Sequence, residues 1–162
     1  MRMKCFMTMT MAAMAFVFSV CSCGSDDDEP EVAVAAQVEG SYTGNEIFIV
    51  DSEESSNETK TYDFAKVSDV SVDLTIPEVG MGMMTIPSIT VTGIALTQEG
   101  NIIKGSVDTY EGTVKGADGS DKAYTVSGFT ALFSDKTVVV TYSLKYGRMP
   151  FPFAGQFTGT RN

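Results

Sequence analysis

The sequence predicts an all-β domain, a single closed or nearly closed eight-stranded antiparallel barrel, with a two-sheet β-sandwich as the alternative. Three observations lead to this prediction. Apolar and polar residues alternate with a period of two along most of the chain after Glu39. The alternation slips by one residue at Gly93 and again at Gly128. The two ends of the domain share the pattern Gly-x-aromatic-Thr-Gly, at 40–44 and at 155–159.

Residues 1–22 have the pattern of a secretory signal peptide. Arg2 and Lys4 form a positively charged start, and residues 6–20 form an apolar run of 15 residues. About 20 apolar residues are needed to span a bilayer, so the pattern favours a cleaved export signal over a retained membrane helix.

The segment Val-Cys-Ser-Cys at 20–23 resembles a bacterial lipobox, with an aliphatic residue three positions before a cysteine and a small residue directly before it. We therefore expect Cys23 to be lipidated and to begin the mature protein. Cys21 is the competing candidate, but it follows Val20, a poor small residue for the cleavage. An ordinary cleaved signal with an unmodified thiol is the other alternative. Three acyl chains, as in lipoproteins of this kind, make a membrane anchor permanent in practice.

Residues 23–38 are predicted to be the lipidated cysteine and a flexible acidic tether. Five of the eight residues at 24–31 are acidic, and charge repulsion with few apolar side chains disfavours folding. The acidic run also resembles the surface-export signal of Bacteroides-type lipoproteins, which implies display on the cell surface. The alternative is retention on the periplasmic face of the outer membrane. A flexible chain of the length of 24–38 reaches roughly 20 Å.

Residues 39–162 are predicted to be the barrel domain. The clearest strands are 69–76 and 138–146, where one face is apolar and the other polar, as in antiparallel strands with one buried face. No helical stripe appears after residue 38. The other predicted strands, separated by turn residues, are 41–50, 59–66, 88–96, 101–107, 110–115, 122–133 and 153–160.

Two of the opening observations favour a barrel over a sandwich. A one-residue slip at a glycine is typical of a β-bulge, and bulges curve a sheet toward closure. The repeated glycine pattern indicates that the first and last strands lie side by side, with Tyr42 and Phe157 as partners across the seam. Such a seam would leave the sheet with no open edge.

Four segments carry a resemblance to the calycin-like, lipocalin-related β-barrel domain of Bacteroides-group lipoproteins. They are 38–44, the stretch 76–87 before a Val-Thr-Gly strand, 139–144 and 153–159. The resemblance covers residues 38–161, nearly the whole mature chain. It implies an eight-stranded barrel and brings no catalytic or ligand-binding residues with it.

Composition excludes several chemistries. The chain has no His, and its 3 Cys fall within the first 23 residues, so imidazole-dependent nucleophiles and Cys/His metal sites are not expected. A net charge of −10 disfavours nucleic acid as a partner. The acidic segments 51–58 and 108–121 lack the spacing of a calcium loop and are interpreted as solvated loops. A carboxylate pair for glycoside hydrolysis needs a defined separation that the sequence does not show. No enzyme, metal or cofactor is predicted.

The expected binding site lies in two segments read as loops, 79–87 and 146–153, which hold all four methionines of the mature chain. Flexible, polarizable side chains at one end of a barrel predict the lip of a cavity for a small hydrophobic or amphipathic ligand. A carboxylate on that ligand would pair with the arginine. The candidate ligand-binding residues are Met81, Met83, Met84, Met149, Phe151 and Arg148.

The alternative is that these segments plug a filled barrel. The protein would then be a structural or interaction component that meets another envelope protein.

Overall fold

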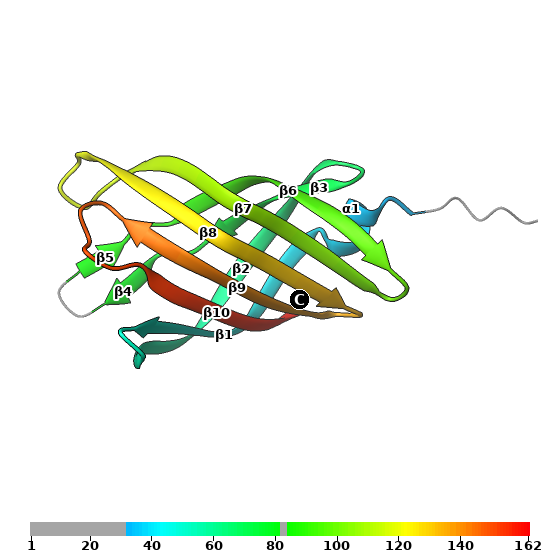
Figure 1. Cartoon of the computed structure of the whole chain (residues 1–162). Helices are drawn as coiled ribbons and strands as arrows, with labels where there is room; N and C mark the ends of the chain where they lie inside the picture. Colours follow the sequence, from blue (N-terminus) through cyan, green and yellow to red (C-terminus); the bar gives the residue numbers. More distant parts are fainter. Residues whose placement is uncertain (1–31, 82–83) are drawn as a thin grey trace, which may run out of the picture. The chain divides into compact units, whose positions relative to one another are not determined.

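The computed structural model describes residues 32–81 and 84–162, which wrap into a closed barrel of eight antiparallel strands (Figure 1). The strand order around the barrel is β1-β10-β9-β8-β7-β6-β3-β2, and a separate two-stranded hairpin, β4-β5, joins β3 to β6. The predicted barrel is confirmed, and the sandwich alternative is wrong. The elements are α1 (Val34–Val38), β1 (Gly40–Val50), β2 (Glu53–Ser68), β3 (Ser71–Ile76), β4 (Val79–Met81), β5 (Met84–Ile86), β6 (Ile89–Glu99), β7 (Ile102–Lys115), β8 (Asp121–Ser134), β9 (Thr137–Tyr146) and β10 (Phe153–Arg161).

Three expected boundaries are corrected. The segments 101–107 and 110–115 form the single strand β7. The acidic segment 51–58 is mostly the start of β2, with the turn reduced to Asp51 and Ser52 in the left-handed region (φ 50° and 70°). The segment 79–87, expected as a loop, carries the β4-β5 hairpin, because its residues pair in antiparallel register.

The phase slips predicted at the two glycines are β-bulges. Gly93 and Gly128 have φ of +69° and +60°, a region that favours glycine. The β3-β6 register shifts beside Gly93, whose N–H donates to the Asp73 carboxylate at 2.8 Å. The β8-β9 register shifts between Ser127 and Thr130, beside Gly128. Each bulge lets the strand bend while the residues on both sides of it keep facing the core.

The first and last strands pair as predicted, but the partners across the seam differ from the expected ones. Phe157 lies opposite Glu46, and Tyr42 lies opposite Arg161. The residues of the repeated pattern that do meet are Gly44 and Gly159. A Cβ on Gly44 would lie 2.0 Å from the carbonyl oxygen of Thr158, so the two strands approach too closely for any side chain there.

Aromatic side chains fill the barrel interior. Tyr42 packs edge-on against Phe64 and Phe133 with ring centroids 5.5 and 5.8 Å apart, and Tyr62 stacks on Phe157 at 3.9 Å. Each such pair contributes about 0.5–1.5 kcal/mol beyond the free energy gained by burying its surface. The interior is therefore a packed core through much of its length rather than an open channel.

The short helix α1 belongs to this core. Ala35 and Val38 are buried, and the Tyr42 hydroxyl donates to the Val38 carbonyl oxygen at 3.0 Å. The expectation that residues 34–38 form part of the tether is therefore wrong, because their apolar side chains pack on β2 and β6. Among the described residues, no helix is long and apolar enough to cross a membrane.

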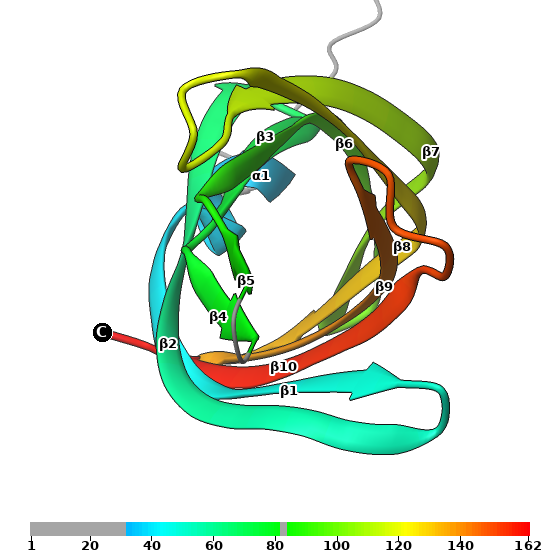
Figure 2. The same cartoon turned by 90° about the vertical axis from the view of Figure 1, so that its left-hand side faces the viewer.

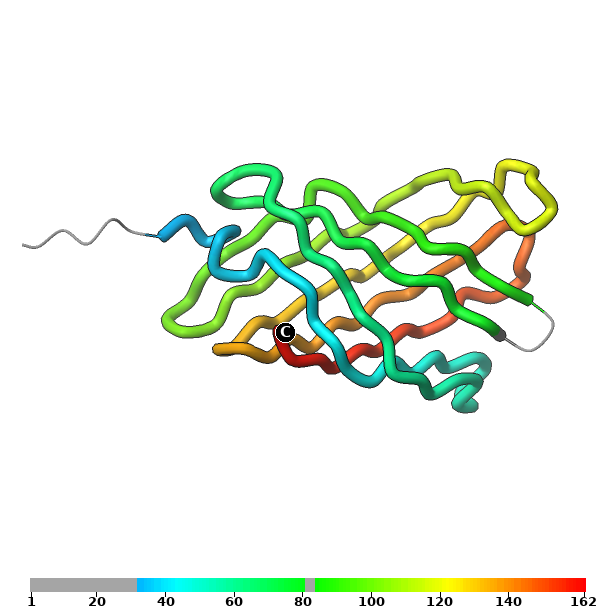
Figure 3. The backbone as a smooth tube through the Cα atoms, turned by 180° about the vertical axis from the view of Figure 1, so that it is seen from behind, coloured from blue at the N-terminus to red at the C-terminus, as the bar shows by residue number. Residues whose placement is uncertain are grey.

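The barrel has two different ends (Figures 1 and 2). One end, which we call the α1 end, holds α1 and the β2-β3, β6-β7 and β8-β9 turns. The other, which we call the mouth, holds the β1-β2, β7-β8 and β9-β10 connections and the β4-β5 hairpin. The hairpin leans into the opening of the mouth. Its first and last residues, Val79 and Ile86, are buried. The tube view in Figure 3 shows the same division from behind.

The close approach of β1 and β10 predicts that a single added methyl group at their seam lowers the stability of the protein. Gly44→Ala should lower the free energy of unfolding by about 3 kcal/mol, because its Cβ meets backbone that cannot yield without separating β1 from β10. The measurement is urea unfolding followed by circular dichroism. Gly80→Ala is the control, since a Cβ there meets nothing within 4 Å. Equal stability of the two variants would show that the seam is looser than described.

Candidate functional site

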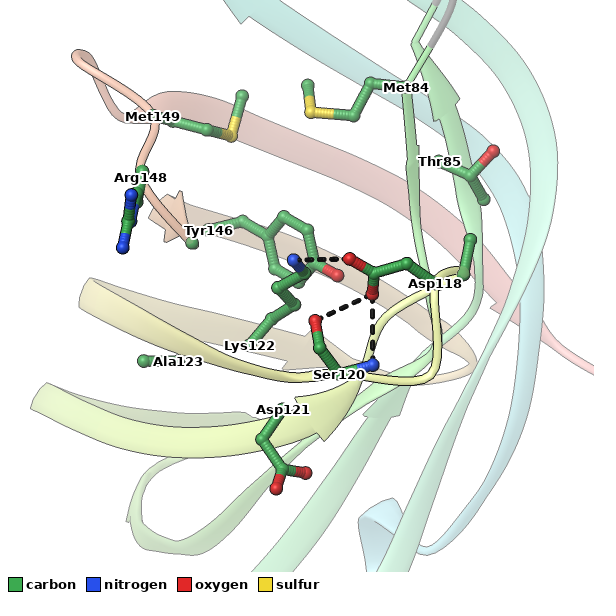
Figure 4. Close-up of a pocket in the computed structure, with 12 residues that line it drawn as sticks. Met84, Thr85, Asp118, Ser120, Asp121, Lys122, Ala123, Tyr146, Arg148 and Met149 are labelled. Carbon is green, nitrogen blue, oxygen red and sulfur yellow. Dashed lines mark hydrogen bonds and ion pairs between the residues drawn. The ribbon is translucent and has the colours of Figure 1, made fainter.

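A pocket of about 920 Å³ opens at the mouth of the barrel (Figure 4). Its wall comes from β5 on one side and from β8, β9 and two connections on the other. The volume falls within the range of sites that hold small molecules. The lining residues are Met84, Thr85, Ala117, Asp118, Ser120, Asp121, Lys122, Ala123, Tyr146, Gly147, Arg148 and Met149.

The pocket exists because strand pairing is incomplete toward the mouth. β6 and β7 pair from Glu99 opposite Ile102 as far as Ala95 opposite Ser106, and no further. Beyond that point the Tyr124 hydroxyl spans the gap and donates to the Thr90 carbonyl oxygen at 2.6 Å. β5, which leads into β6, therefore stands apart from β8 and β9. The space between them is the pocket.

The apolar part of the pocket is built from two methionines and a tyrosine. Met84 comes from β5 and Met149 from the β9-β10 connection, and both are half-buried. Their thioether ends point toward each other across the pocket, with the Tyr146 ring beneath them (Figure 4). Tyr146 is buried at the end of β9. Thioether chains adapt to irregular shapes, so this wall can accommodate apolar groups of different outline.

The polar part of the pocket is the β7-β8 turn. The Asp118 carboxylate accepts hydrogen bonds from Lys122 Nζ at 2.9 Å, from Ser120 Oγ at 2.7 Å and from the Ser120 N–H at 3.1 Å. These donors hold the pKa of Asp118 well below its usual range. The Lys122 charge is thus already paired. Arg148 is exposed, and no carboxylate of the described residues lies within 4 Å of its guanidinium.

The structure brings three of the expected ligand-binding residues, Met84, Arg148 and Met149, to one pocket. Phe151 is 68% exposed and is not among the lining residues. Met83 and the side chain of Met81 lie outside the described residues. The sequence allows two interpretations of segment 79–87, as the lip of a ligand cavity or as a plug of the barrel. Each interpretation describes part of it, since Val79 and Ile86 are buried in the core while Met84 faces the pocket.

A second feature, a buried carboxyl group inside the barrel, was not anticipated from the sequence. Glu46 on β1 is 1% exposed, and its Oε1 accepts a hydrogen bond from the Tyr62 hydroxyl. The Tyr62 hydroxyl also lies 2.9 Å from that of Tyr142. Glu46 Oε2 has no hydrogen-bond partner among the described residues. The sequence signal that could have found Glu46 is the period-two alternation of β1, because Glu46 lies on the same face of the strand as the buried Tyr42 and Phe48.

Burial changes the acidity of this group. Desolvation raises the pKa of Glu46 to about 6, although the Tyr62 hydrogen bond and nearby Lys60 work in the opposite direction. Burial likewise raises the pKa of Tyr142. Buried groups with displaced pKa values are concentrated at functional sites, but they also occur in structural networks. Glu46 lies outside the lining of the mouth pocket.

Metal binding has no site among the residues described: they contain no group of three or more Asp, Glu, His or Cys side chains placed to hold an ion. The expected solvated loop 108–121 is also corrected in part. Asp108 and Glu111 lie within β7, and Asp118 lies in the turn that follows it.

Comparison with known proteins supports the fold. The chain is similar to a solved structure from Bacteroides fragilis described as a “putative outer membrane protein”, with a TM-score of 0.62 and 21% sequence identity. The similarity covers 80% of this chain and 53% of that one, so the chain spans about half the length of that protein. No protein-family model and no curated protein matches the sequence. The likeness at this identity concerns the β-barrel alone.

Glu46 predicts a pH dependence of stability. Because its pKa is raised from 4.5 to about 6 on folding, its contribution is fully present below pH 4.5 and is lost as the pH rises through 6. The loss should be about 2 kcal/mol, at 1.36 kcal/mol per unit. Urea unfolding of the wild type between pH 4.5 and 7.5 measures it.

Two variants isolate this effect. Glu46→Gln should remove the pH dependence in this window, since the amide does not ionise. Glu111→Gln, at an exposed position on β7, should retain it. A wild-type profile that is flat over the window would contradict the assignment to Glu46.

Proposed function

We propose that this protein is a non-catalytic cell-surface lipoprotein of the outer membrane whose barrel mouth binds a small hydrophobic or amphipathic ligand. One observation carries the proposal: two methionines from distant parts of the sequence, Met84 and Met149, face each other across a pocket of about 920 Å³. Paired apolar side chains on an accessible pocket are favourable contacts for an apolar ligand.

The composition of the pocket favours a ligand with an apolar body and an anionic end. The two thioethers and Tyr146 offer the apolar surface. Arg148, beside them, offers a guanidinium that can form two parallel hydrogen bonds with a carboxylate. Binding is favoured over catalysis because the ionisable pair at the rim, Asp118 and Lys122, is engaged with itself.

The location rests on the start of the sequence. Residues 20–23 match a lipobox with Cys23 as the modified residue, and the acidic run at 24–31 suits export to the surface. The Bacteroides fragilis protein of similar fold carries an outer-membrane description of its own, which supports the same location for this chain. The alternative location is the periplasmic face of the outer membrane. Protease added to intact cells separates the two, because it digests a surface-displayed protein and leaves a periplasmic one intact.

A second function has an observation in its favour. The barrel interior below the pocket is filled by stacked and edge-on aromatic rings, as expected of a structural or interaction component that has no internal ligand. Native mass spectrometry of the full-length protein, purified from its own envelope, separates the two. A co-purifying small molecule supports the binding module, whereas a co-purifying envelope protein with no small molecule supports the interaction component.

Probe binding tests the pocket residues directly. The polypeptide from Gly24, which lacks the acyl chains, should bind the amphipathic anion anilinonaphthalene sulfonate with a rise in fluorescence. Met84→Gln or Met149→Gln should weaken binding about tenfold, because each replaces apolar contact worth about 1.4 kcal/mol. Arg148→Gln should weaken binding of this anion but not of the uncharged probe aminoanthracene.

Phe151→Gln is the matched control, because its ring lies outside the pocket lining. It should bind the probe as the wild type does. Equal affinity in all four variants would place the ligand elsewhere, and a failure of the wild type to bind either probe would remove the proposal.

A further inference from the structure

Exposed apolar side chains are gathered at one end of the barrel. Among the described residues, seven large apolar side chains are strongly exposed. One of them, Phe151, lies at the mouth. The others belong to the segments that form the α1 end. They are Val32, Val67, Val70, Ile102, Leu132 and Val139.

These residues flank the turns that surround that end. Val70 lies in the β2-β3 turn and is 59% exposed, and Ile102 follows the β6-β7 turn and is 51% exposed. Leu132 and Val139 are register partners on either side of the β8-β9 turn. The three turns and α1 lie at the same end of the molecule in both side views (Figures 1 and 3). Single exposed apolar residues are ordinary, but their concentration at one end indicates a contact surface.

Charged residues of both signs border this surface, since the exposed acids Asp69, Glu99 and Asp135 lie at its three turns together with two lysines. Lys104 on β7 is the register partner of Leu132, so its side chain leaves the outer face of the barrel next to that leucine. Lys136 lies within the β8-β9 turn, and its backbone carbonyl oxygen accepts the Arg161 N–H. Apolar side chains at turn tips, with charges of both signs beside them, suit the boundary between lipid acyl chains and zwitterionic headgroups, which carry both charges themselves.

The chain enters the barrel at the same end. Val32, the first described residue, stands just before α1, and it follows Cys23 by nine residues. Nine residues span about 30 Å when fully extended and roughly 17 Å as a flexible chain. A bilayer that holds acyl chains on Cys23 therefore lies within reach of the α1 end.

We infer that the α1 end docks on the lipid surface of the membrane, with Val70 and Ile102 inserted at the level of the headgroups. The inference rests on the proposed lipidation of Cys23. Docking in this orientation points the mouth and its pocket away from the membrane. The pocket would then take its ligand from the surrounding medium and not from the bilayer.

Tryptophan fluorescence tests the orientation, because the natural chain contains no Trp. The full-length lipidated protein is made as Val70→Trp, Ile102→Trp and Phe151→Trp, and each is reconstituted in phosphatidylcholine vesicles with plain or brominated acyl chains. All three positions are exposed, so the substitutions leave the core intact. We expect a blue shift and a loss of emission in brominated vesicles for the first two variants, and neither change for Phe151→Trp.

The outcomes separate docking from anchoring. Co-flotation of the protein with the vesicles reports the anchor by itself. If the protein floats but Val70→Trp and Ile102→Trp stay unquenched, docking is overturned while anchoring stands, and the apolar surface is left for a protein partner. If Phe151→Trp is the quenched variant, the orientation is reversed and the inference fails. A protein that does not float overturns both anchoring and docking.

Discussion

Closure of the sheet at the β1-β10 seam is the constraint on which the rest of the structure depends. A strand edge exposes backbone donors and acceptors, and a small antiparallel sheet avoids this only by pairing its first strand with its last. Here the two strands meet with Gly44 opposite Gly159, at a distance that leaves no room for a side chain on Gly44. Within the repeated pattern, Gly44 therefore serves close backbone approach, whereas Gly155 leaves room for the Tyr142 ring and Gly159 for the Phe157 ring.

The two ends of the barrel differ in how completely their strands pair. Near the α1 end every neighbouring pair of strands is joined, and α1 adds Ala35 and Val38 to a core of aromatic rings. Toward the mouth, β6 separates from β7, and the β4-β5 hairpin replaces a continuous wall. A packed core at one end and incomplete pairing at the other give a rigid support beneath an open pocket. Rigid support with a variable rim is the usual arrangement of a binding site on a β scaffold.

The fold was predictable because its signals are local and repeated. Alternation marked most strands, and the phase slips at Gly93 and Gly128 marked the bulges that bend them. The methionine segments indicated where a site would lie, and Met84, Arg148 and Met149 do line one pocket. The side of the pocket formed by Asp118 and Lys122 was not predictable, because it depends on how far β5 stands from β8 after the barrel closes.

Glu46 shows the same limit in another form. Its inward phase could be read from β1, but its burial and its link to Tyr62 and Tyr142 arise only when β1, β2 and β9 share one interior. The Tyr42 and Phe157 pairing failed for a related reason. A repeated motif fixes which strands are neighbours, whereas their register is set by packing across the whole sheet.

The most direct test of closure is a cross-strand nuclear Overhauser measurement at the seam. A Cβ on Gly44 would lie 2.3 Å from the Cα of Gly159, so the α-hydrogens of the two glycines must be close in space. We expect a strong effect between them, together with slowly exchanging amides along β1 and β10. Absence of any cross-strand effect, with rapid exchange in both strands, would show that the sheet is open, and the mouth and its pocket would then have no fixed frame.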